Sequence, residues 1–186
     1  ELTRLNAELE VVSRRDPLTG VGNRLRMEED VQAISRDLER SGRTGALALV
    51  DVDHFKKYND CFGHLAGDGV LRQIGSALGA SLRAGDGVYR YGGEEFLLLL
   101  PGATVADAKA VIDRLNDAIA ALGIVHPGNE PWGVITISAG IAPLGPGDAD
   151  NWLRTADQAL YRAKDAGRNA TGLAERGMVR VLRRAA

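Results

Sequence analysis

The order of the predicted strands and helices constrains this chain more than any other feature of its sequence. Apolar runs typical of strands alternate with stretches that repeat apolar side chains at helical spacing. We expect strands at 46–52, 88–91, 96–100 and 134–141, and helices at 69–80 and from Thr104 to Leu122. This β-α-β-β-α-β order predicts an α+β fold with a ferredoxin-like core, in which the third strand lies between the first two and runs antiparallel to both.

Three further helices are predicted around this core. One follows the N-cap residue Asn23 and ends at Gly42, and another spans about 150–165 and ends before Gly167. In the first of these, the side chains expected to face the core are Leu25, Val31, Ile34 and Leu38. The third covers residues 1–14, where an a/d spacing typical of coiled coils is formed by Leu2, Leu5, Leu9 and Val12. It fits either a stalk that pairs two protomers in parallel or a helix packed on its own domain.

The same pattern divides the chain into three parts. Residues 1–14 are expected to form an N-terminal helical stalk, residues 15–170 a folded domain, and residues 171–186 a C-terminal tail. We predict a tail because periodicity fades after Asn169, and because residues 176–186 hold four arginines and no acid. The chain also starts at Glu1 in helical register, which favours a segment of a longer polypeptide.

Composition excludes several classes of protein. The 186 residues carry 23 Lys and Arg against 25 Asp and Glu, a net charge of −2, so no basic field exists to bind a nucleic-acid polymer. A single cysteine, Cys61, rules out an internal disulfide and a cysteine-rich zinc site. No apolar run approaches the roughly 20 residues that cross a bilayer. We therefore expect a cytoplasmic domain, which an upstream segment of the full-length protein could still anchor to a membrane.

Four acids are predicted to meet at one edge of the sheet. In the predicted topology the end of the first strand, with Asp51 and Asp53, lies beside the turn that holds Glu94 and Glu95. Carboxylates without nearby cations repel one another, so a hard divalent cation such as Mg²⁺ would stabilise the group. The alternative is four solvated acids at a sheet end.

Glycines and cations accompany these acids. Gly92 and Gly93 would let a phosphate or a ribose approach the backbone, and a type I′ turn is the alternative explanation for them. Lys164 and Arg168, four residues apart at the end of the last helix, could bind one anion together or simply stabilise a helix C-terminus.

Five short segments carry the most specific signal in the sequence. They are 16–24 (DPLTGVGNR), 51–60 (DVDHFKKYND), 63–68 (GHLAGD), 90–96 (RYGGEEF) and 164–169 (KDAGRN). In this order they resemble the GGDEF family of diguanylate cyclases over roughly residues 16–169. Several separated motifs in the right order are far more specific than any one of them.

The resemblance implies an enzyme with a nucleotidyl-cyclase or palm-like core. Two protomers, each holding one GTP, would meet as a homodimer and join their nucleotides into cyclic di-GMP, with release of two pyrophosphates. It also implies two Mg²⁺ or Mn²⁺ ions per active site and an upstream sensor domain on the full-length chain. The implied catalytic residues are Asp51, Glu94 and Glu95. Glu94 stands where the signature usually has Asp, and it is a candidate to take the proton of the attacking hydroxyl.

The family's binding residues carry over by matching positions. Asp51, the Val52 carbonyl and Glu95 are implied to ligate the metal ions. Asn59 and Asp68 are implied to recognise guanine. The remaining implied contacts are Gly92 and Gly93 along the nucleotide, and Lys164 and Arg168 at its terminal phosphates.

A second site is implied just before the second strand. Arg83 and Asp86 form an Arg-x-x-Asp motif placed where this family binds cyclic di-GMP as an inhibitor, and Arg114 falls where the family supplies a further arginine. An exposed turn salt bridge between Arg83 and Asp86 is the alternative.

Two other functions are consistent with parts of this pattern. A GGDEF-like domain could be a catalytically silent receptor for GTP or cyclic di-GMP, which the intact signature acids argue against. A phosphotransferase could use Asp51 and Asp53 as nucleophile and acid on a larger doubly wound sheet, which the predicted element order disfavours.

Overall fold

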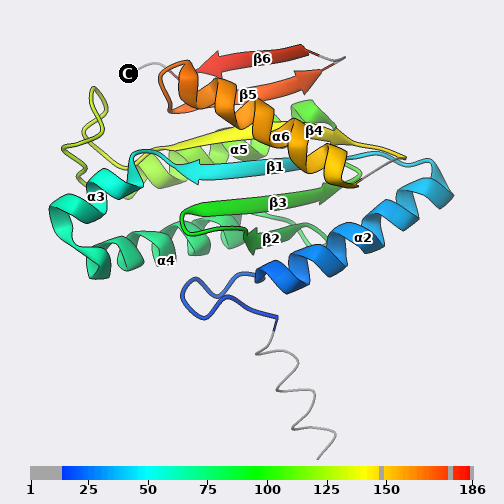
Figure 1. Ribbon diagram of the computed structural model, residues 1–186, viewed down its shortest axis with the longest axis horizontal. Coiled ribbons are helices and arrows are strands. Elements are labelled where there is room, and N and C mark those ends of the chain that lie inside the picture. Colours follow the sequence, from blue (N-terminus) through cyan, green and yellow to red (C-terminus); the bar gives the residue numbers. More distant parts are fainter. Residues whose placement is uncertain (1–13, 147–148, 176–177, 185–186) are drawn as a thin grey trace, which may run out of the picture.

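The protein is built around one sheet of six strands. The computed structural model describes residues 14–146, 149–175 and 178–184. Its strands are β1 (Gly45–Val52), β2 (Gly87–Arg90), β3 (Glu95–Pro101), β4 (Ile137–Leu144), β5 (Ala170–Glu175) and β6 (Met178–Arg183). They lie in the order β2-β3-β1-β4-β5-β6, and β3, between β1 and β2, is antiparallel to both. This arrangement, seen in Figure 1, confirms the predicted α+β fold and its ferredoxin-like core.

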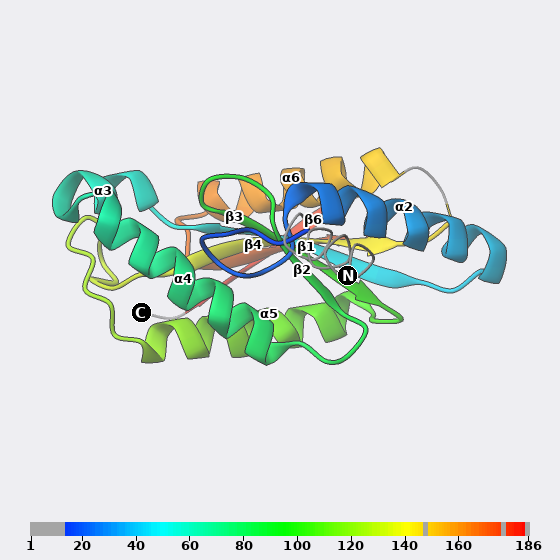
Figure 2. The ribbon, with the colours of Figure 1, turned by 90° about the horizontal axis from the view of Figure 1, so that it is seen from below.

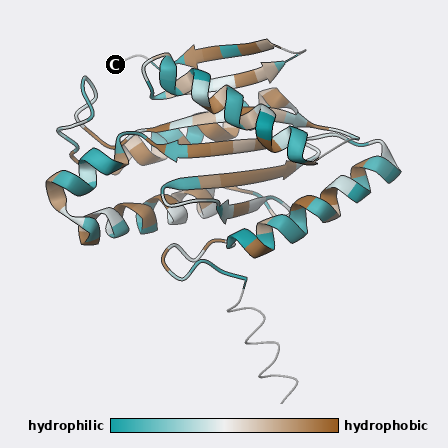
Figure 3. Ribbon diagram, in the orientation of Figure 1, coloured by the Kyte–Doolittle hydropathy of each residue, from teal (hydrophilic) through white to brown (hydrophobic). Residues whose placement is uncertain are grey.

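Helices cover both faces of the sheet. They are α2 (Arg24–Ser41), α3 (Phe55–Phe62), α4 (His64–Ser81), α5 (Val105–Ala121) and α6 (Ala149–Asp165). Figure 2 shows α2 and α6 on one face and α4 and α5 on the other. Alternate residues of β1 serve the two layers: Leu47 and Leu49 join the apolar cluster of α2 and α6, whereas Ala48 and Val50 join that of α4 and α5. The central strands are therefore apolar along their length, while the helices carry polar residues outward (Figure 3).

The predicted helix ends are confirmed where capping residues mark them. The side chain of Asn23 accepts a hydrogen bond from the backbone N–H of Arg26, and Gly42 ends α2 in the left-handed conformation, with φ of 64°. Thr104 and Asp107 form a reciprocal capping box at the start of α5.

One side chain predicted to face the core of α2 does not. Leu25 is 49% exposed, and the buried residues of the helix are Met27, Val31 and Leu38. Because each residue advances about 100° around an α-helix, Leu25 lies about 200° from Met27 and points away from the sheet.

The segment between β1 and the body of α4 differs from the prediction. We expected one helix from residue 69, but α4 begins at His64 and a separate short helix, α3, precedes it. Gly63, with φ of 85°, divides the two helices. Phe55 and Tyr58 of α3 are buried in the core. The sequence pattern missed this pair because residues 63–69 include three glycines, which weaken a helical signal.

The expected C-terminal tail is largely a hairpin that extends the sheet. β5 runs parallel to β4, and β6 runs antiparallel to β5. β5 is buried although most of its residues are small, because α6 packs directly on it: a Cβ on Gly172 would clash with the backbone of Ala159. Arg184 attaches the end of the hairpin to Asp117 of α5. Small residues in a buried strand give no apolar alternation, which explains the loss of pattern after Asn169.

The predicted stalk remains a prediction. Of residues 1–14, only Arg14 is among the described residues, so the seam of Leu2, Leu5, Leu9 and Val12 lies outside them. No helix within the described ranges is both long enough and apolar enough to cross a membrane.

Candidate active site

Two acids from neighbouring strands meet at one end of the sheet. The end of β1 and the start of β3 lie on the side of the sheet nearest α3 (Figure 1). Asp51 on β1 is the register partner of Glu95 on β3. Leu49 and Leu97, two positions away on the same strands, face α2 and α6, so both acids lie on that face of the sheet. Asp51 is only 5% exposed, and its Oδ2 lies 2.8 Å from Nζ of Lys164 on α6. Segments far apart in the sequence therefore bring two carboxylates and an ammonium together.

Negative charge is incompletely balanced at this edge. Burial raises the pKa of Asp51 to about 6, with Lys164 opposing the rise and Glu94 and Glu95 adding to it. Burial also raises the pKa of Glu94, which Lys164 again opposes and Glu95 reinforces. A raised carboxyl pKa means that ionisation is disfavoured in the folded protein, so Lys164 does not fully offset burial and repulsion. A further cation would stabilise the ionised acids.

The donor set fits a divalent cation whose coordination is completed by a substrate. Within residues 14–146, 149–175 and 178–184, no three His, Cys, Asp or Glu side chains converge closely enough to hold a metal ion by themselves. Mg²⁺ is commonly held by one or two protein carboxylates together with substrate phosphates. Asp51 and Glu95, with the carbonyl of Val52, therefore fit Mg²⁺ or Mn²⁺ in the presence of a nucleotide.

Asp53 does not belong to this group, so the expected cluster of four acids is wrong in one member. Its carboxylate is fully buried and accepts hydrogen bonds from the hydroxyls of Thr136 and Ser138 and from the backbone N–H of Asn169. The strand ends at Val52, so alternation along β1 no longer decides where Asp53 lies. These bonds make Asp53 a structural anchor between β1, β4 and the turn after α6.

The two cations predicted to hold phosphates lie at the C-terminal end of α6. Lys164 is on the last turn of the helix, and Arg168 is on the turn that follows, where it has a positive φ of 65°. The backbone N–H of Arg168 donates to the carbonyl of Ala163. Asp53 holds the next residue, Asn169, so the position of this turn depends on the buried anchor. Lys164 contacts Asp51 directly, whereas Arg168 lies close enough to His54 for its charge to lower the pKa of that imidazole, after the larger effect of burial.

The Gly92-Gly93 turn is not the type I′ turn considered above. Such a turn needs positive φ at both central residues, and neither glycine has one. A Cβ on Gly92 would instead lie 2.6 Å from Oε2 of Glu95, while the Cβ position of Gly93 is open. Gly92 is therefore required for the close approach of the Glu95 carboxylate to the turn.

Arg90 and Asp16, for which no role was predicted, hold this turn in place. Arg90 donates from Nε and Nη2 to the carbonyl of Gly93, and its Nη1 lies 3.3 Å from Asp16. Asp16 in turn accepts hydrogen bonds from the hydroxyl and backbone N–H of Thr19. Arg90 belongs to the motif segment 90–96 and Asp16 to the segment 16–24, and this membership was the only sign in the sequence that they have a role.

The residues expected to contact guanine lie on adjacent helices beside the acid edge. α3 carries Asn59, and α4 carries Asp68 directly after Gly67, against which the Asn59 side chain packs. The Oδ1 atom of Asn59 is buried and has no hydrogen-bond partner among the described residues. The structure thus brings the two residues into one region without fixing Asn59 by a hydrogen bond at its oxygen.

The predicted inhibitory residues line one hollow at the other end of β2. Arg83, Asp86 and Arg114 surround a space of about 250 Å³ between α5 and the segment before β2. The turn salt bridge is also present, because Arg83 Nε lies 3.3 Å from Asp86 Oδ1. Arg83 donates as well to the carbonyl of Pro101. Its side chain is nevertheless 64% exposed, so the turn contact leaves this arginine accessible.

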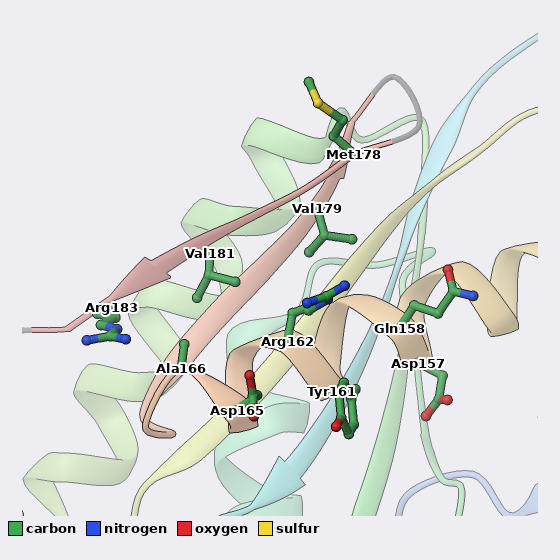
Figure 4. Close-up of a pocket in the computed structure, with 10 residues that line it drawn as sticks. All are labelled: Asp157, Gln158, Tyr161, Arg162, Asp165, Ala166, Met178, Val179, Val181 and Arg183. Carbon is green, nitrogen blue, oxygen red and sulfur yellow. The ribbon is translucent and has the colours of Figure 1, made fainter.

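A larger hollow is lined by none of these residues. Figure 4 shows it between α6 and the edge strand β6, with a volume of about 1260 Å³. Tyr161 and Arg162 of α6 and Val179 and Val181 of β6 are among the residues that line it. In the described part of the chain, its lining contains none of the residues predicted to bind metal, nucleotide or inhibitor. Size alone therefore does not identify the active site.

Known proteins resemble this chain in sequence over most of its length. The family description "Diguanylate cyclase, GGDEF domain" matches residues 13–170. Diguanylate cyclase DgcP of Pseudomonas aeruginosa is 45% identical over 155 residues, covering 83% of this chain and 23% of that protein. The probable diguanylate cyclase DgcC of Escherichia coli is 36% identical over 176 residues, covering 94% of this chain and 47% of that protein. The chain thus spans less than half the length of these two curated relatives.

Solved structures of similar fold point the same way. The coiled coil and GGDEF domain of DgcB from Caulobacter crescentus, in complex with c-di-GMP, matches with a TM-score of 0.83 and 31% identity, over 93% of each chain. Diguanylate cyclase SiaD from Pseudomonas aeruginosa, in complex with its activator SiaC, matches with a TM-score of 0.81 and 36% identity, over 93% of this chain and 66% of that one.

Proposed function

The chain belongs to the GGDEF family, and we propose that it is a diguanylate cyclase, which condenses two GTP molecules into cyclic di-GMP and releases two pyrophosphates. The observation that carries this proposal is the register pairing of Asp51 with Glu95 beside Lys164. Two carboxylates on neighbouring strands next to an ammonium suit a metal-bound triphosphate, because the acids hold the cation and the ammonium neutralises phosphate.

Each half of the reaction joins a ribose 3′ oxygen to an α-phosphorus. The O3′–Pα bond forms, the bond between Pα and the bridging oxygen to Pβ breaks, and pyrophosphate leaves. Asp51, Glu95 and the Val52 carbonyl would hold two Mg²⁺ or Mn²⁺ ions, which supply charge neutralisation at the phosphates. Glu94, on the adjoining turn, is the proposed acceptor of the 3′-hydroxyl proton.

The leaving pyrophosphate carries charge that cations at the end of α6 would neutralise. Lys164 stands at the acid edge and Arg168 on the following turn. In this proposal, both bind the terminal phosphates of GTP, with Gly92 and Gly93 next to the nucleotide. Exchange of the Lys164 contact from Asp51 to phosphate would free that carboxylate for the metal.

Asn59 and Asp68 are the proposed selectors of guanine. The Asp68 carboxylate accepts hydrogen bonds from the guanine N1 and N2 hydrogens, whereas adenine has an acceptor at N1 and no amine at position 2. The Asn59 carboxamide adds N–H donors, which a carboxylate lacks. This pair favours GTP over ATP.

The reaction requires two protomers, because each ribose oxygen attacks the nucleotide that the other protomer holds. We propose that residues 15–170 form the catalytic domain and that residues 1–14 form a stalk that aligns two of these domains under an upstream sensor in the cytoplasm. The solved DgcB fragment, described as a coiled coil and GGDEF domain, supports this arrangement.

Cyclic di-GMP is the proposed inhibitor at the second hollow. The exposed guanidinium of Arg83 and that of Arg114 can pair with guanine acceptors, and Asp86 can accept from its N–H groups. The complex of DgcB with c-di-GMP supports this ligand for the fold.

Nucleotide turnover by the purified protein tests the proposed activity. With Mg²⁺ and GTP we expect cyclic di-GMP and pyrophosphate, with a rate per protomer that rises with protein concentration, and no cyclic product from ATP. GTP binding without any product would instead identify a silent receptor. Release of inorganic phosphate alone would identify a phosphatase, and either result would overturn the proposal.

A further inference from the structure

Gly67 occupies a position where the protein has no room for a side chain. A Cβ built on Gly67 would lie 2.9 Å from Cγ of Asn59 and 3.0 Å from Cζ of Phe55, and closer still to Oδ1 of Asn59. Non-bonded carbon atoms normally stay about 3.5–4.0 Å apart. The Asn59 side chain of α3 therefore fills the space that a Cβ on α4 would take.

Backbone conformation does not explain this glycine. Gly67 lies inside α4 and has no positive φ, unlike Gly63 before the helix. A glycine in a helix interior costs roughly 1 kcal/mol relative to alanine. Gly69, two residues later in the same helix, has nothing within 4 Å of its Cβ position. What distinguishes Gly67 is the side chain packed against it.

The contact with Gly67 orients the Asn59 carboxamide. Its Oδ1 atom lies against Gly67, is buried, and has no hydrogen-bond partner among the described residues. Packing and not hydrogen bonding thus fixes this oxygen. Because the oxygen and the NH₂ group point in different directions from Cγ, the NH₂ group is directed away from Gly67. Asp68 follows Gly67 in the chain, so the Asn59 side chain of α3 lies against the residue next to Asp68 in α4.

We propose that Gly67 is a positioning residue for guanine recognition: the missing Cβ lets the Asn59 carboxamide lie against α4 with its NH₂ group free to reach the base bound beside Asp68. The inference rests on the proposed function, since it concerns the base that this active site selects. Guanine offers hydrogen-bond acceptors next to its N–H groups, so a donor and a carboxylate side by side complement it. A side chain at position 67 would displace the carboxamide, whose flexible end yields at little cost to stability.

The test compares Gly67→Ala with Gly69→Ala, which adds the same methyl group to the same helix in open space. For Gly67→Ala we expect the apparent KM for GTP to rise roughly 5- to 20-fold, as for loss of one or two hydrogen bonds, with kcat at saturating GTP near that of the parent. Gly69→Ala should keep the parent KM. Gly69→Ala should not unfold at a lower temperature, because alanine favours a helix. In Gly67→Ala the close contact with Phe55 opposes that gain, so its unfolding temperature should stay near that of the parent. A parent KM in Gly67→Ala would overturn the proposal.

A double-variant cycle separates positioning from a general packing defect. In an Asn59→Ala background the two atoms closest to the new methyl group are gone and only Phe55 Cζ, at 3.0 Å, stays near it, so Gly67→Ala should raise KM little further. Equal rises in KM in both backgrounds would mean that the methyl group acts on the backbone or directly on the substrate. That outcome would also overturn the proposal.

Calorimetric binding of GTP without turnover distinguishes this proposal from the proposed activity. If the parent makes cyclic di-GMP and Gly67→Ala binds GTP as tightly as the parent, only the role of Gly67 fails. If the parent makes no product but binds GTP, the cyclase proposal fails. The role of Gly67 would then still be supported if Gly67→Ala weakens GTP binding in the parent but causes no further weakening in the Asn59→Ala background.

Discussion

Two arginine–aspartate pairs bracket strand β2, and they differ in how completely each arginine is enclosed. At the end that leads into the signature turn, Arg90 Nη1 lies 3.3 Å from Asp16 Oδ2, and the two side chains are 20% and 15% exposed. At the other end, Arg83 Nε lies 3.3 Å from Asp86 Oδ1; the Asp86 side chain is only 5% exposed, but the Arg83 side chain is 64% exposed. The two ion pairs thus have the same N–O distance, although Arg90 is enclosed and Arg83 is open to solvent.

The difference shows that the remaining partners, and not the ion-pair distance, decide what an arginine can do. Arg90 also donates twice to the carbonyl of Gly93, so its guanidinium ties the signature turn to Asp16 in the N-terminal segment. Arg83 has the carbonyl of Pro101 as a further partner but keeps most of its surface in solvent. We infer that the first pair is structural and that the second leaves room for a ligand.

The largest effect on activity should come from changing Glu95, which follows the turn that the Arg90–Asp16 pair holds in place. Glu95→Gln removes a proposed metal-binding charge and should lower kcat for cyclic di-GMP formation by about 10²- to 10³-fold, as for loss of a preorganised electrostatic contact. Asp86→Asn, an equally conservative change at the open pair, should keep the initial rate near that of the parent. Similar losses in both variants would erase the distinction between the two ends of β2.

Breaking the enclosed pair should cost stability. Arg90→Met removes two hydrogen bonds to Gly93 and leaves Asp16 without its ion pair, so the free energy of unfolding in urea should fall by about 1–3 kcal/mol. Turnover should fall as well, because the turn that carries Glu94 and Glu95 loses its support. Arg40→Met, which removes an exposed pair with Asp37, is the control and should change stability little. Equal stability of Arg90→Met and the parent would refute a structural role for the enclosed pair.

Breaking the open pair should change regulation more than stability. Arg83→Met should lower the free energy of unfolding by about 1 kcal/mol, because Asp86 loses its ion pair but keeps the hydrogen bond from the backbone N–H of residue 83. The initial turnover should stay near that of the parent. The concentration of cyclic di-GMP that halves the rate should rise by about 10- to 100-fold, as for loss of a hydrogen bond to a charged group. Unchanged inhibition would show that Arg83 and Asp86 only stabilise a turn and bind no inhibitor.

The smallest effect should be the pH dependence of the enclosed pair. Burial alone would raise the pKa of Asp16, but hydrogen bonds from Thr19 and the charge of Arg90 outweigh it, so the pKa lies below its usual value. The folded state then binds fewer protons than the unfolded state near the unfolded pKa of about 4, and this stabilisation is lost as the pH falls through the folded pKa.

Asp16→Asn isolates that contribution. Its free energy of unfolding should lie about 1 kcal/mol below that of the parent at neutral pH, and the gap should close as the pH falls below about 4. Asp37→Asn, at an exposed pair, should show little gap at any pH. A gap at Asp16 that is constant with pH would show that its charge contributes nothing.

The candidate site shows where sequence reasoning succeeds and where it stops. The meeting of Asp51 and Glu95 at one edge of the sheet follows from the predicted order of the elements, whereas their register pairing is seen only in the structure. The fate of Asp53 does not follow, because its partners Thr136, Ser138 and Asn169 lie 83 to 116 residues away and β1 has already ended. The hairpin of β5 and β6 was missed for a related reason. β5 needs small residues because α6 packs closely on it, and small residues give no alternation of apolar and polar side chains that would predict a strand.

The sequence by itself determined the layered α+β core, its helix caps, and the edge of the sheet at which Asp51, Glu94 and Glu95 lie, because these depend on periodicity, on element order and on hydrogen bonds between near neighbours. Only the tertiary structure decided that Asp53 is an anchor, that Arg90 is enclosed while Arg83 is open, and that Gly67 makes space for Asn59. Each of these depends on which side chains from separate segments occupy the same few ångströms. Packing sets that occupancy, and no repeat along the chain encodes it.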